Sequence, residues 1–433
     1  MRTNLVHPGA DELHYEIRAI VDLAKQVEKL GTTITWENIG DPVAKGEPIS
    51  PWIKEIVQAA AGEDASYAYS PTRGLLATRE YIAKERNLEG GIQITPDDIL
   101  FFNGLGDAIS KIYGHLHAGA RVIGPNPAYP THSSAEAAHS GKPHLTYPLN
   151  PEKGWAPDLE ALEQTLQDNP DIAGIIIINP DNPTGFVYPQ ETVRAMVDLA
   201  RRYKLFIISD EIYSNLAQPD SGMRKLASVI EEVPGIALRG ISKEFPWPGG
   251  RCGWAEFYNR DADENFDRYV RSIVDAKMLE VCSTTLPQKA LPQVMSDERY
   301  YPHLATRLEH YARRADEAYR VLSAIPELVI HKPQGAFYMT AVFKEGALSD
   351  TQSLALSDEI ASVISPKLEG VAPDQRFCYQ LLGATGLCVV PLSSGLNATH
   401  QGFRFTLLER DDAKYSAMLG TLKESITQYL ASA

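Results

Sequence analysis

A regular alternation of short apolar runs and longer segments of helical character, between about residues 95 and 260, most constrains the fold. The clearest run is Ile175 to Ile178, four consecutive isoleucines, which is typical of a buried strand. Strand, helix and strand repeated in this order predict an α/β fold with a mainly parallel sheet that helices cover on both faces. The runs predicted as strands are 99–102, 121–124, 174–179, 205–209, 236–241 and 253–258, and the segments predicted as helices are 106–117, 131–140, 158–167 and 189–203.

The two ends of the chain lie outside this alternation and indicate a second unit. At roughly 100–200 residues per domain, the 433 residues allow two or three domains. We expect a large domain at 46–324 and a smaller α+β domain formed by 1–45 together with 325–433. Within the first segment, 11–30 is predicted to be a helix that Gly31 ends.

Charge and hydropathy exclude several classes of partner. The formal net charge is −15, which repels nucleic-acid phosphate and anionic lipid, so we expect no nucleic acid and no membrane as partners. The isoleucine run is far shorter than the ~20 residues that cross a bilayer. Residues 1–20 carry no apolar core of a signal peptide, and the four cysteines form no CxxC pair. The sequence therefore predicts a cytoplasmic protein with reduced thiols.

Motifs for metal, nucleotide and serine-hydrolase chemistry are missing from the sequence. His115 and His117 are two positions apart, which would place them on different faces of a helix, and the other histidines are predicted to be surface or packing residues. HExxH, GxxxxGK[ST] and GxSxG patterns do not occur. We therefore expect no metal site, no NTP hydrolysis and no serine nucleophile.

Three polar motifs lie beside successive predicted strands. Residues 179–185 (NPDNPTG) follow the isoleucine run, 209–213 (SDEIY) follow the next apolar run, and 242–254 (SKEFPWPGGRCGW) lie between two more. Ligands of parallel sheets bind beyond the carboxyl ends of the strands, so these motifs are expected to meet. Each alone has an ordinary interpretation as a turn, a helix cap or a solvated lysine. Together they indicate a ligand site.

In combination these motifs resemble those of the class I/II aminotransferases, which have fold type I and depend on pyridoxal 5′-phosphate (PLP). NPxNPTG and SK(x)7R are highly specific as a pair. The resemblance runs through nearly the whole chain and implies a large PLP-binding domain, a small domain and a homodimer with shared active sites. The other matching segments are 40–42, 69–74, 103–108, 126–129, 335–338 and 403–405.

The resemblance implies catalytic roles for Lys243, Asp210 and Tyr213. Lys243 would form the Schiff base with PLP and later move the proton between the substrate Cα and C4′ of the cofactor. Asp210 would pair with the pyridine nitrogen, so that the ring can accept electrons. Asn182 and Tyr213 would hydrogen-bond the phenolic O3′. Tyr129 would stack on the ring, although a plain core aromatic is the alternative.

The phosphate of the cofactor is expected at the start of a helix. Gly104, Leu105 and Gly106 lie where a predicted strand meets a predicted helix, and their backbone N–H groups would point at an anion. Because Ile109 occupies the third glycine position of GxGxxG, the segment is not a dinucleotide fingerprint.

Side chains complete the phosphate site that the resemblance implies. Ser242 would add a hydroxyl and Arg251 a guanidinium, which suits bidentate contact with phosphate. Tyr69 would reach the phosphate of the neighbouring subunit. The cofactor is therefore expected to lie where two copies of the chain meet.

Arg404 matches the arginine that binds the substrate carboxylate in this family, where its planar fork holds both oxygens. A surface ion pair is the alternative for Arg404. Gly40 and Asn182 belong to the same implied substrate site. The N-terminal stretch is most similar to the alanine-type branch, in which this segment folds over the substrate, so Tyr15 and Arg18 would line the pocket. Segments 246–249 and 393–400 depart from the family pattern and could favour an aromatic or acidic substrate.

The sequence thus predicts a transaminase that moves an amino group between L-alanine and 2-oxoglutarate. A transaminase of aspartate or aromatic amino acids is one alternative. A C–S β-lyase is another, because the same carbanion eliminates when the substrate carries a leaving group. A regulator that binds the cofactor without turnover is disfavoured, since the lysine, the aspartate and the carboxylate arginine are all present.

Overall fold

The structure is a computed structural model that describes residues 5–13 and 17–432. Its strands are β1 Thr35–Trp36, β2 Ile99–Phe102, β3 Arg121–Asn126, β4 Thr146–Asn150, β5 Ala156–Pro157, β6 Ile172–Ile178, β7 Phe206–Asp210, β8 Gly235–Gly240, β9 Gly253–Tyr258, β10 Leu328–Ile330, β11 Tyr338–Phe343, β12 Leu387–Cys388, β13 Val390–Pro391 and β14 Gly402–Thr406. Its helices are α1 Ile17–Lys29, α2 Pro51–Ala61, α3 Leu76–Leu88, α4 Leu105–Gly114, α5 Pro130–Ser140, α6 Leu159–Asp168, α7 Gln190–Tyr203, α8 Ile241–Glu244, α9 Glu264–Leu279, α10 Thr285–Ser296, α11 Tyr300–Leu322, α12 Asp358–Ile364, α13 Pro373–Thr385, α14 Leu392–Gly395 and α15 Asp412–Ala431.

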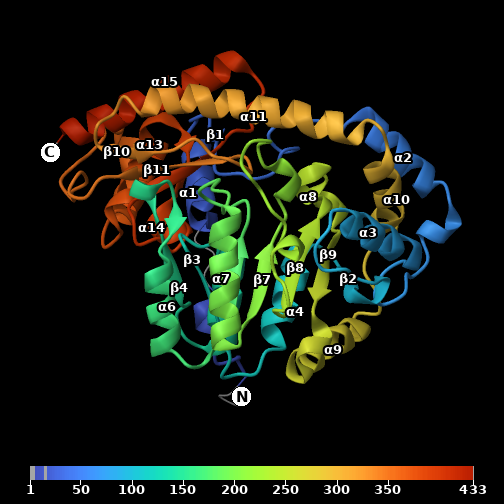
Figure 1. Ribbon diagram of the computed structural model, residues 1–433. Coiled ribbons are helices and arrows are strands. Elements are labelled where there is room, and N and C mark those ends of the chain that lie inside the picture. The colour runs from blue at the N-terminus through green and yellow to red at the C-terminus, as the bar shows by residue number, and fades with distance from the viewer. Residues whose placement is uncertain (1–4, 14–16, 433) are drawn as a thin grey trace.

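An eight-stranded sheet in the order β2-β9-β8-β7-β6-β3-β4-β5 organises the larger part of the molecule (Figure 1). Strands β8, β7, β6, β3 and β4 pair in parallel, which confirms the mainly parallel sheet expected from the sequence. Strand β9 runs antiparallel to both β8 and β2, so β2 points in the same direction as β8. The carboxyl ends of β2, β6, β7 and β8 therefore share one edge of the sheet.

The isoleucine run forms the centre of this sheet. Ile175 and Ile177 pack into one apolar cluster, whereas Ile176 and Ile178 pack into another. Successive side chains of a strand point to opposite faces, so four isoleucines in a row supply both faces at once. Helix α7 packs on the first face, and helices α4 and α9 pack on the second.

The two ends of the chain come together beside this sheet. Strand β1 pairs in parallel with β12, with Thr35 opposite Leu387, and strands β10, β11, β14 and β13 form a four-stranded antiparallel sheet. Helix α11 runs along the top of the view, from the β10 side to α10 and α2 (Figure 1). The domain division at 46–324 stays a prediction, and the two larger sheets fall on either side of it.

Some element bounds differ from the prediction for local reasons. The segment containing Lys243, which the sequence places between two predicted strands, forms the short helix α8, whose free carbonyl groups at Lys243 and Glu244 accept hydrogen bonds from Arg307. Helix α4 ends at Gly114, so His115 and His117 follow the helix instead of lying on two of its faces. Pro189 precedes α7 with extended backbone (ψ 151°) and is not its first helical residue. None of the described helices is long and apolar enough to span a bilayer.

Candidate active site

Four strand ends bring the predicted residues to one edge of the large sheet. Strand β2 leads into Gly104 and α4, β6 leads into the loop that carries Asn182, β7 ends at Asp210, and β8 leads into Lys243 on α8. Strand β14, from the four-stranded sheet, brings Arg404 to the same place, since its guanidinium contacts Asn182. The site is thus built from both sheets.

The amine of Lys243 is held by a main-chain carbonyl. Its Nζ donates a hydrogen bond of 2.6 Å to the carbonyl oxygen of Gly40 and lies 5.7 Å from the ring centroid of Phe337. Among the described residues no carboxylate forms an ion pair with this Nζ. A Cβ at Gly40 would lie 2.0 Å from the hydroxyl oxygen of Tyr338, so only glycine permits this close approach. A neutral carbonyl can release the amine to another partner without leaving a buried charge unpaired.

The carboxylate of Asp210 is buried and has two neighbours that can donate to it. Its Oδ1 accepts a hydrogen bond of 3.1 Å from the backbone N–H of Ile212. Its Oδ2 lies 3.1 Å from Nε2 of His132, whose Nδ1 lies 3.3 Å from the hydroxyl of Tyr113. These contacts fix the orientation of the carboxylate beyond the end of β7.

The sequence motifs assign no role at the site to His132. This histidine is buried on α5 and faces Asp210. The available signal was its spacing of three residues from Tyr129, with Pro130 between them as the first helical residue. That spacing places both rings on one face of the helix, where their centroids lie 6.3 Å apart.

Arg404 lies buried with one unused donor. Its Nη1 donates to Oδ1 of Asn182 at 3.1 Å, and its Nη2 donates to the carbonyl oxygen of Asn38 at 2.8 Å. Its Cζ stacks 4.3 Å from the ring centroid of Tyr338. Its Nε has no hydrogen-bond partner among the described residues, although it is buried. A buried arginine with a free donor is suited to bind a carboxylate.

A pair of phenols lies between Arg404 and the strand ends. The hydroxyl of Tyr213 donates to the hydroxyl of Tyr338 at 3.1 Å. Burial raises the pKa of Tyr213 well above its usual value, and the neighbouring Tyr338 raises it further. Tyr213 therefore stays protonated at neutral pH and remains a hydrogen-bond donor. The sequence motif contained Tyr338 without assigning it a role.

The start of α4 forms an open cradle beside a guanidinium. Gly104 adopts a φ of +84°, and a Cβ there would lie 2.3 Å from Nη2 of Arg251. Next to Gly106 there is open space, because an added Cβ would meet no atom within 4 Å. Backbone N–H groups in the first helical turn, with an arginine beside them, are a suitable site for phosphate.

A family model for aminotransferase class I and II matches residues 38–415. The chain belongs to this family. It is a PLP-dependent aminotransferase of fold type I, as the sequence motifs predicted.

This aminotransferase is similar over most of its length to proteins of three organisms. An uncharacterized aminotransferase of Methanocaldococcus jannaschii is 51% identical over 431 residues, which cover 99% of this chain and 100% of that protein. The glutamate-pyruvate aminotransferase AlaA of Escherichia coli K12 is 27% identical over 75% of this chain and 79% of its own. The solved structure of an alanine aminotransferase from Pyrococcus furiosus has a TM-score of 0.83 and 25% identity, over 97% of this chain and 98% of that one.

The residues of this aminotransferase fit PLP. The cradle at Gly104 with Arg251 suits the phosphate, the buried carboxylate of Asp210 suits a protonated ring nitrogen, and the amine of Lys243 has a neutral carbonyl as its hydrogen-bond partner. The unused donor on Arg404 suits the carboxylate of a substrate.

Five predicted residues have a less defined place. Tyr129 precedes α5 and is half-buried, and Ser242 is half-buried on α8. Tyr69 is 84% exposed. Arg18 is exposed near the start of α1, and Tyr15 lies outside the described residues. Their roles in the aminotransferase stay predictions.

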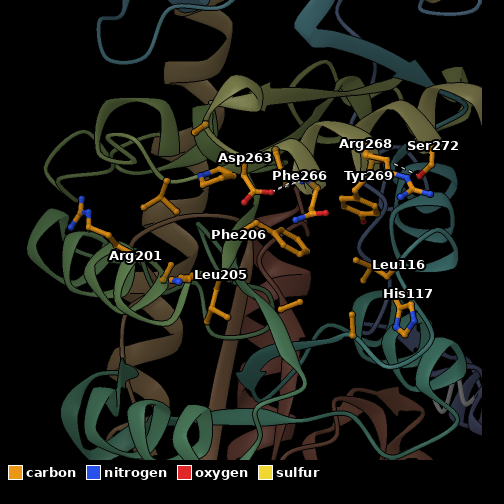
Figure 2. A pocket seen from close by; sticks show the side chains of 18 of the residues that line it. Leu116, His117, Arg201, Leu205, Phe206, Asp263, Phe266, Arg268, Tyr269 and Ser272 are labelled. Atoms are coloured by element: carbon orange, nitrogen blue, oxygen red, sulfur yellow. Dashed lines mark hydrogen bonds between the residues drawn. The ribbon is translucent and has the colours of Figure 1, made fainter.

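A cavity of about 880 Å³ lies away from this site, at the amino ends of the central strands. It is bounded by Ala173 at the start of β6, Phe206 at the start of β7, and Phe266 and Tyr269 on α9. Figure 2 shows the rings of Phe206, Phe266 and Tyr269 around it. None of the candidate active-site residues lines this cavity.

A buried carboxyl next to Asn182 makes the stability of the aminotransferase depend on pH. Burial raises the pKa of Asp181 to about 7, although Thr184 donates to its Oδ2 from both the backbone N–H and the hydroxyl. A carboxyl whose pKa is higher in the folded state than in the unfolded state stabilises the fold fully at low pH. That contribution is lost as the pH rises from about 4 to about 7.

Replacing Asp181 by asparagine is expected to remove this dependence. The difference in the free energy of unfolding between Asp181→Asn and the wild type should move in favour of the variant by about 1.4 kcal/mol per pH unit from about pH 4 to pH 7, and stay constant above. Thermal unfolding midpoints at several pH values within and above this window measure the trend. The exposed Asp220→Asn is the matched control. A constant difference across the window would show that Asp181 does not titrate there.

Proposed function

We propose that this aminotransferase transfers the amino group of L-alanine to 2-oxoglutarate, giving pyruvate and L-glutamate. The observation that carries the site is the convergence of Lys243, Asp210 and Arg404 from separate strands on one edge of the sheet. The choice of alanine is supported by the names of its relatives, which include the E. coli glutamate-pyruvate aminotransferase and the P. furiosus alanine aminotransferase.

The residues divide the work between binding and proton transfer. PLP, when bound, supplies an electron sink for the bonds at the substrate Cα. Arg404, with Nη1 on Asn182, binds the α-carboxylate and thereby orients the Cα. The Nζ of Lys243, once released from the carbonyl of Gly40, would take the proton from this Cα and deliver it to C4′ of PLP.

Three further features of the site would hold the cofactor. Asp210, oriented by His132 and the N–H of Ile212, would hold a proton on the ring nitrogen of PLP. The hydroxyl of Tyr213, which burial keeps protonated, would turn its proton from Tyr338 to the phenolic oxygen of PLP. Backbone N–H groups at the start of α4 and the guanidinium of Arg251 hold the phosphate.

The site is completed, in this proposal, by a second copy of the chain. Two neighbouring segments carry exposed side chains, namely Tyr67, Tyr69, Met278, Leu279 and Val281. The hydroxyl of Thr72 joins these segments by donating a hydrogen bond of 2.9 Å to the carbonyl oxygen of Val281. Leu279 is 91% exposed. Apolar and aromatic side chains exposed together are typical of a protein interface. Tyr69 would then contribute its hydroxyl to the phosphate of the partner.

The absorbance spectrum of the PLP-loaded protein tests this function. L-Alanine alone, without an oxo acid, is expected to convert the visible band to a near-ultraviolet band, and 2-oxoglutarate should restore it. L-Aspartate, L-phenylalanine and L-cystathionine serve as comparison substrates. Faster conversion by aspartate or phenylalanine would replace alanine as the substrate. Release of pyruvate and ammonia from cystathionine without an oxo acid would favour the β-lyase.

A further inference from the structure

One segment of the chain, residues 37–47, connects the two groups that would bind substrate and cofactor. At its first end the carboxylate of Glu37 is completely buried and accepts hydrogen bonds from Nζ of Lys45 at 2.8 Å and from Oγ1 of Thr406 at 2.7 Å. Thr406 lies two residues after Arg404 on β14, so both side chains are on the same face of that strand. The first end is therefore attached to the strand of Arg404.

The second end is attached to the backbone of Lys243. Glu47 is buried and accepts hydrogen bonds from Nε of Arg307 at 2.5 Å and from the hydroxyl of Tyr311 at 3.0 Å. The same guanidinium donates from Nη1 to the carbonyl oxygens of Lys243, at 2.6 Å, and Glu244, at 2.8 Å. Arg307 thus links the end of the segment to the helix that carries the lysine.

Between these ends, two carbonyl groups contact the active-site cations directly. The carbonyl of Asn38 accepts from Nη2 of Arg404, and the carbonyl of Gly40 accepts from Nζ of Lys243. The segment is short and internally bonded, because the N–H of Lys45 donates to the carbonyl of Asp41 and the N–H of Glu47 donates to that of Pro42. These two bonds hold residues 41–47 in one turn, which leads from the carbonyls of Asn38 and Gly40 to Glu47.

The two ion pairs are costly features to place inside a protein. Moving two charges out of water loses solvation that their attraction only partly restores, and an apolar pair of similar volume is often as stable. The side chains of Lys45 and Glu37 are 7% and 1% exposed, so both are desolvated. Burial raises the pKa of Glu37, and the cation of Lys45 opposes that rise. Stability alone therefore gives no strong reason for charges at these positions, whereas fixed geometry does.

We propose that residues 37–47 act as a strap that sets the distance between Arg404 and Lys243, in which Glu37 and Lys45 position the arginine and Glu47 and Arg307 position the lysine. This inference rests on the proposed roles of Arg404 and Lys243. It assigns a different function to each end. Loosening the Glu37 end displaces the group that binds the carboxylate, and loosening the Glu47 end displaces the amine that moves the proton.

Two variants test the strap, and two kinds of quantity are measured for each. The double substitution Glu37→Gln/Lys45→Met removes both charges of the first pair, so that no buried charge is left alone. Glu47→Gln keeps an acceptor for Arg307 but removes the charge. The readouts are the KM values for the amino and oxo acids, and the pH midpoint at which the visible band of the bound PLP changes. The matched control is Asp22→Asn/Lys25→Met, an exposed pair on α1 with 3.6 Å between its charged atoms.

The strap predicts that the two variants change different quantities. Glu37→Gln/Lys45→Met should raise both KM values by about tenfold to a hundredfold and leave the pH midpoint unchanged. Glu47→Gln should shift the pH midpoint and lower kcat, with KM changed by less than about twofold. The control should alter none of these quantities. Equal effects of both variants on both readouts, or a lowered thermal midpoint with wild-type KM and pH midpoint, would overturn the strap.

The amino acid used is the one that the wild type converts fastest. If that is not L-alanine, the proposed substrate is wrong, but both comparisons remain valid. If the wild-type protein shows a PLP band and Lys243→Ala retains it in the same form, the role of Lys243 is wrong and the strap is rejected with it.

Discussion

Replacement of Lys243 by alanine is expected to reduce the rate of transamination by at least about 10⁴-fold. The substitution removes the amine that lies beside the carbonyl of Gly40, which is the group proposed to take the proton from the substrate Cα. Turnover of L-alanine with 2-oxoglutarate measures the effect, and the spectrum of the bound PLP should lose its wild-type visible band. Lys204→Ala, an exposed lysine at the end of α7, is the control and should behave as the wild type. Transamination retained by Lys243→Ala would remove this residue from the mechanism.

The same variant also tests whether the active site is shared between subunits. In a mixture of Lys243→Ala and Tyr69→Ala, a mixed dimer with shared sites contains one site with both native residues. If subunits exchange at random, half of the dimers are mixed, and about a quarter of the wild-type activity returns. If each site uses the Tyr69 of its own chain, mixing restores nothing. The exposure of Tyr69 in a single chain favours the first result.

The arrangement of the site could be predicted where it depends on strand order. Four isoleucines in a row indicated a strand buried on both faces, and the structure places alternate isoleucines in two separate clusters. Motifs that follow parallel strands must meet at one edge, so Asn182, Asp210 and Lys243 could be brought together before any coordinates were known. The helices that connect successive strands set the parallel direction of those strands, and the sequence shows this alternation of strands and helices directly.

Contacts between distant segments could not be predicted in the same way. The bond between Glu47 and Arg307 joins residues 260 positions apart, and nothing in either local sequence indicates the other. His132 on α5 shows the same difficulty, since its partner Asp210 lies at the end of β7, 78 residues away. Such pairs depend on how the helices pack around the sheet, which periodicity does not specify.

Replacement of Asp210 by asparagine is expected to lower kcat by roughly 10³-fold. Asparagine has nearly the same size and can still accept from the N–H of Ile212, so the loop after β7 should keep its shape. What it loses is the negative charge that would pair with the ring nitrogen of PLP. Asparagine could not keep a proton on that nitrogen at neutral pH, so the bound cofactor would be a weaker electron sink.

Two variants separate the charge of Asp210 from its position. Asp210→Glu keeps the charge on a longer side chain and should recover part of the rate lost in Asp210→Asn. His132→Gln removes the ring that faces Oδ2 but leaves the carboxylate, so its loss should be smaller than that of Asp210→Asn. The KM for the amino acid should change little in all three, because Arg404 and Asn182 contact each other without Asp210. A kcat for Asp210→Asn within about tenfold of the wild type would mean that the charge is not needed. A loss in His132→Gln as large as that in Asp210→Asn would mean that orientation of the carboxylate matters as much as its charge.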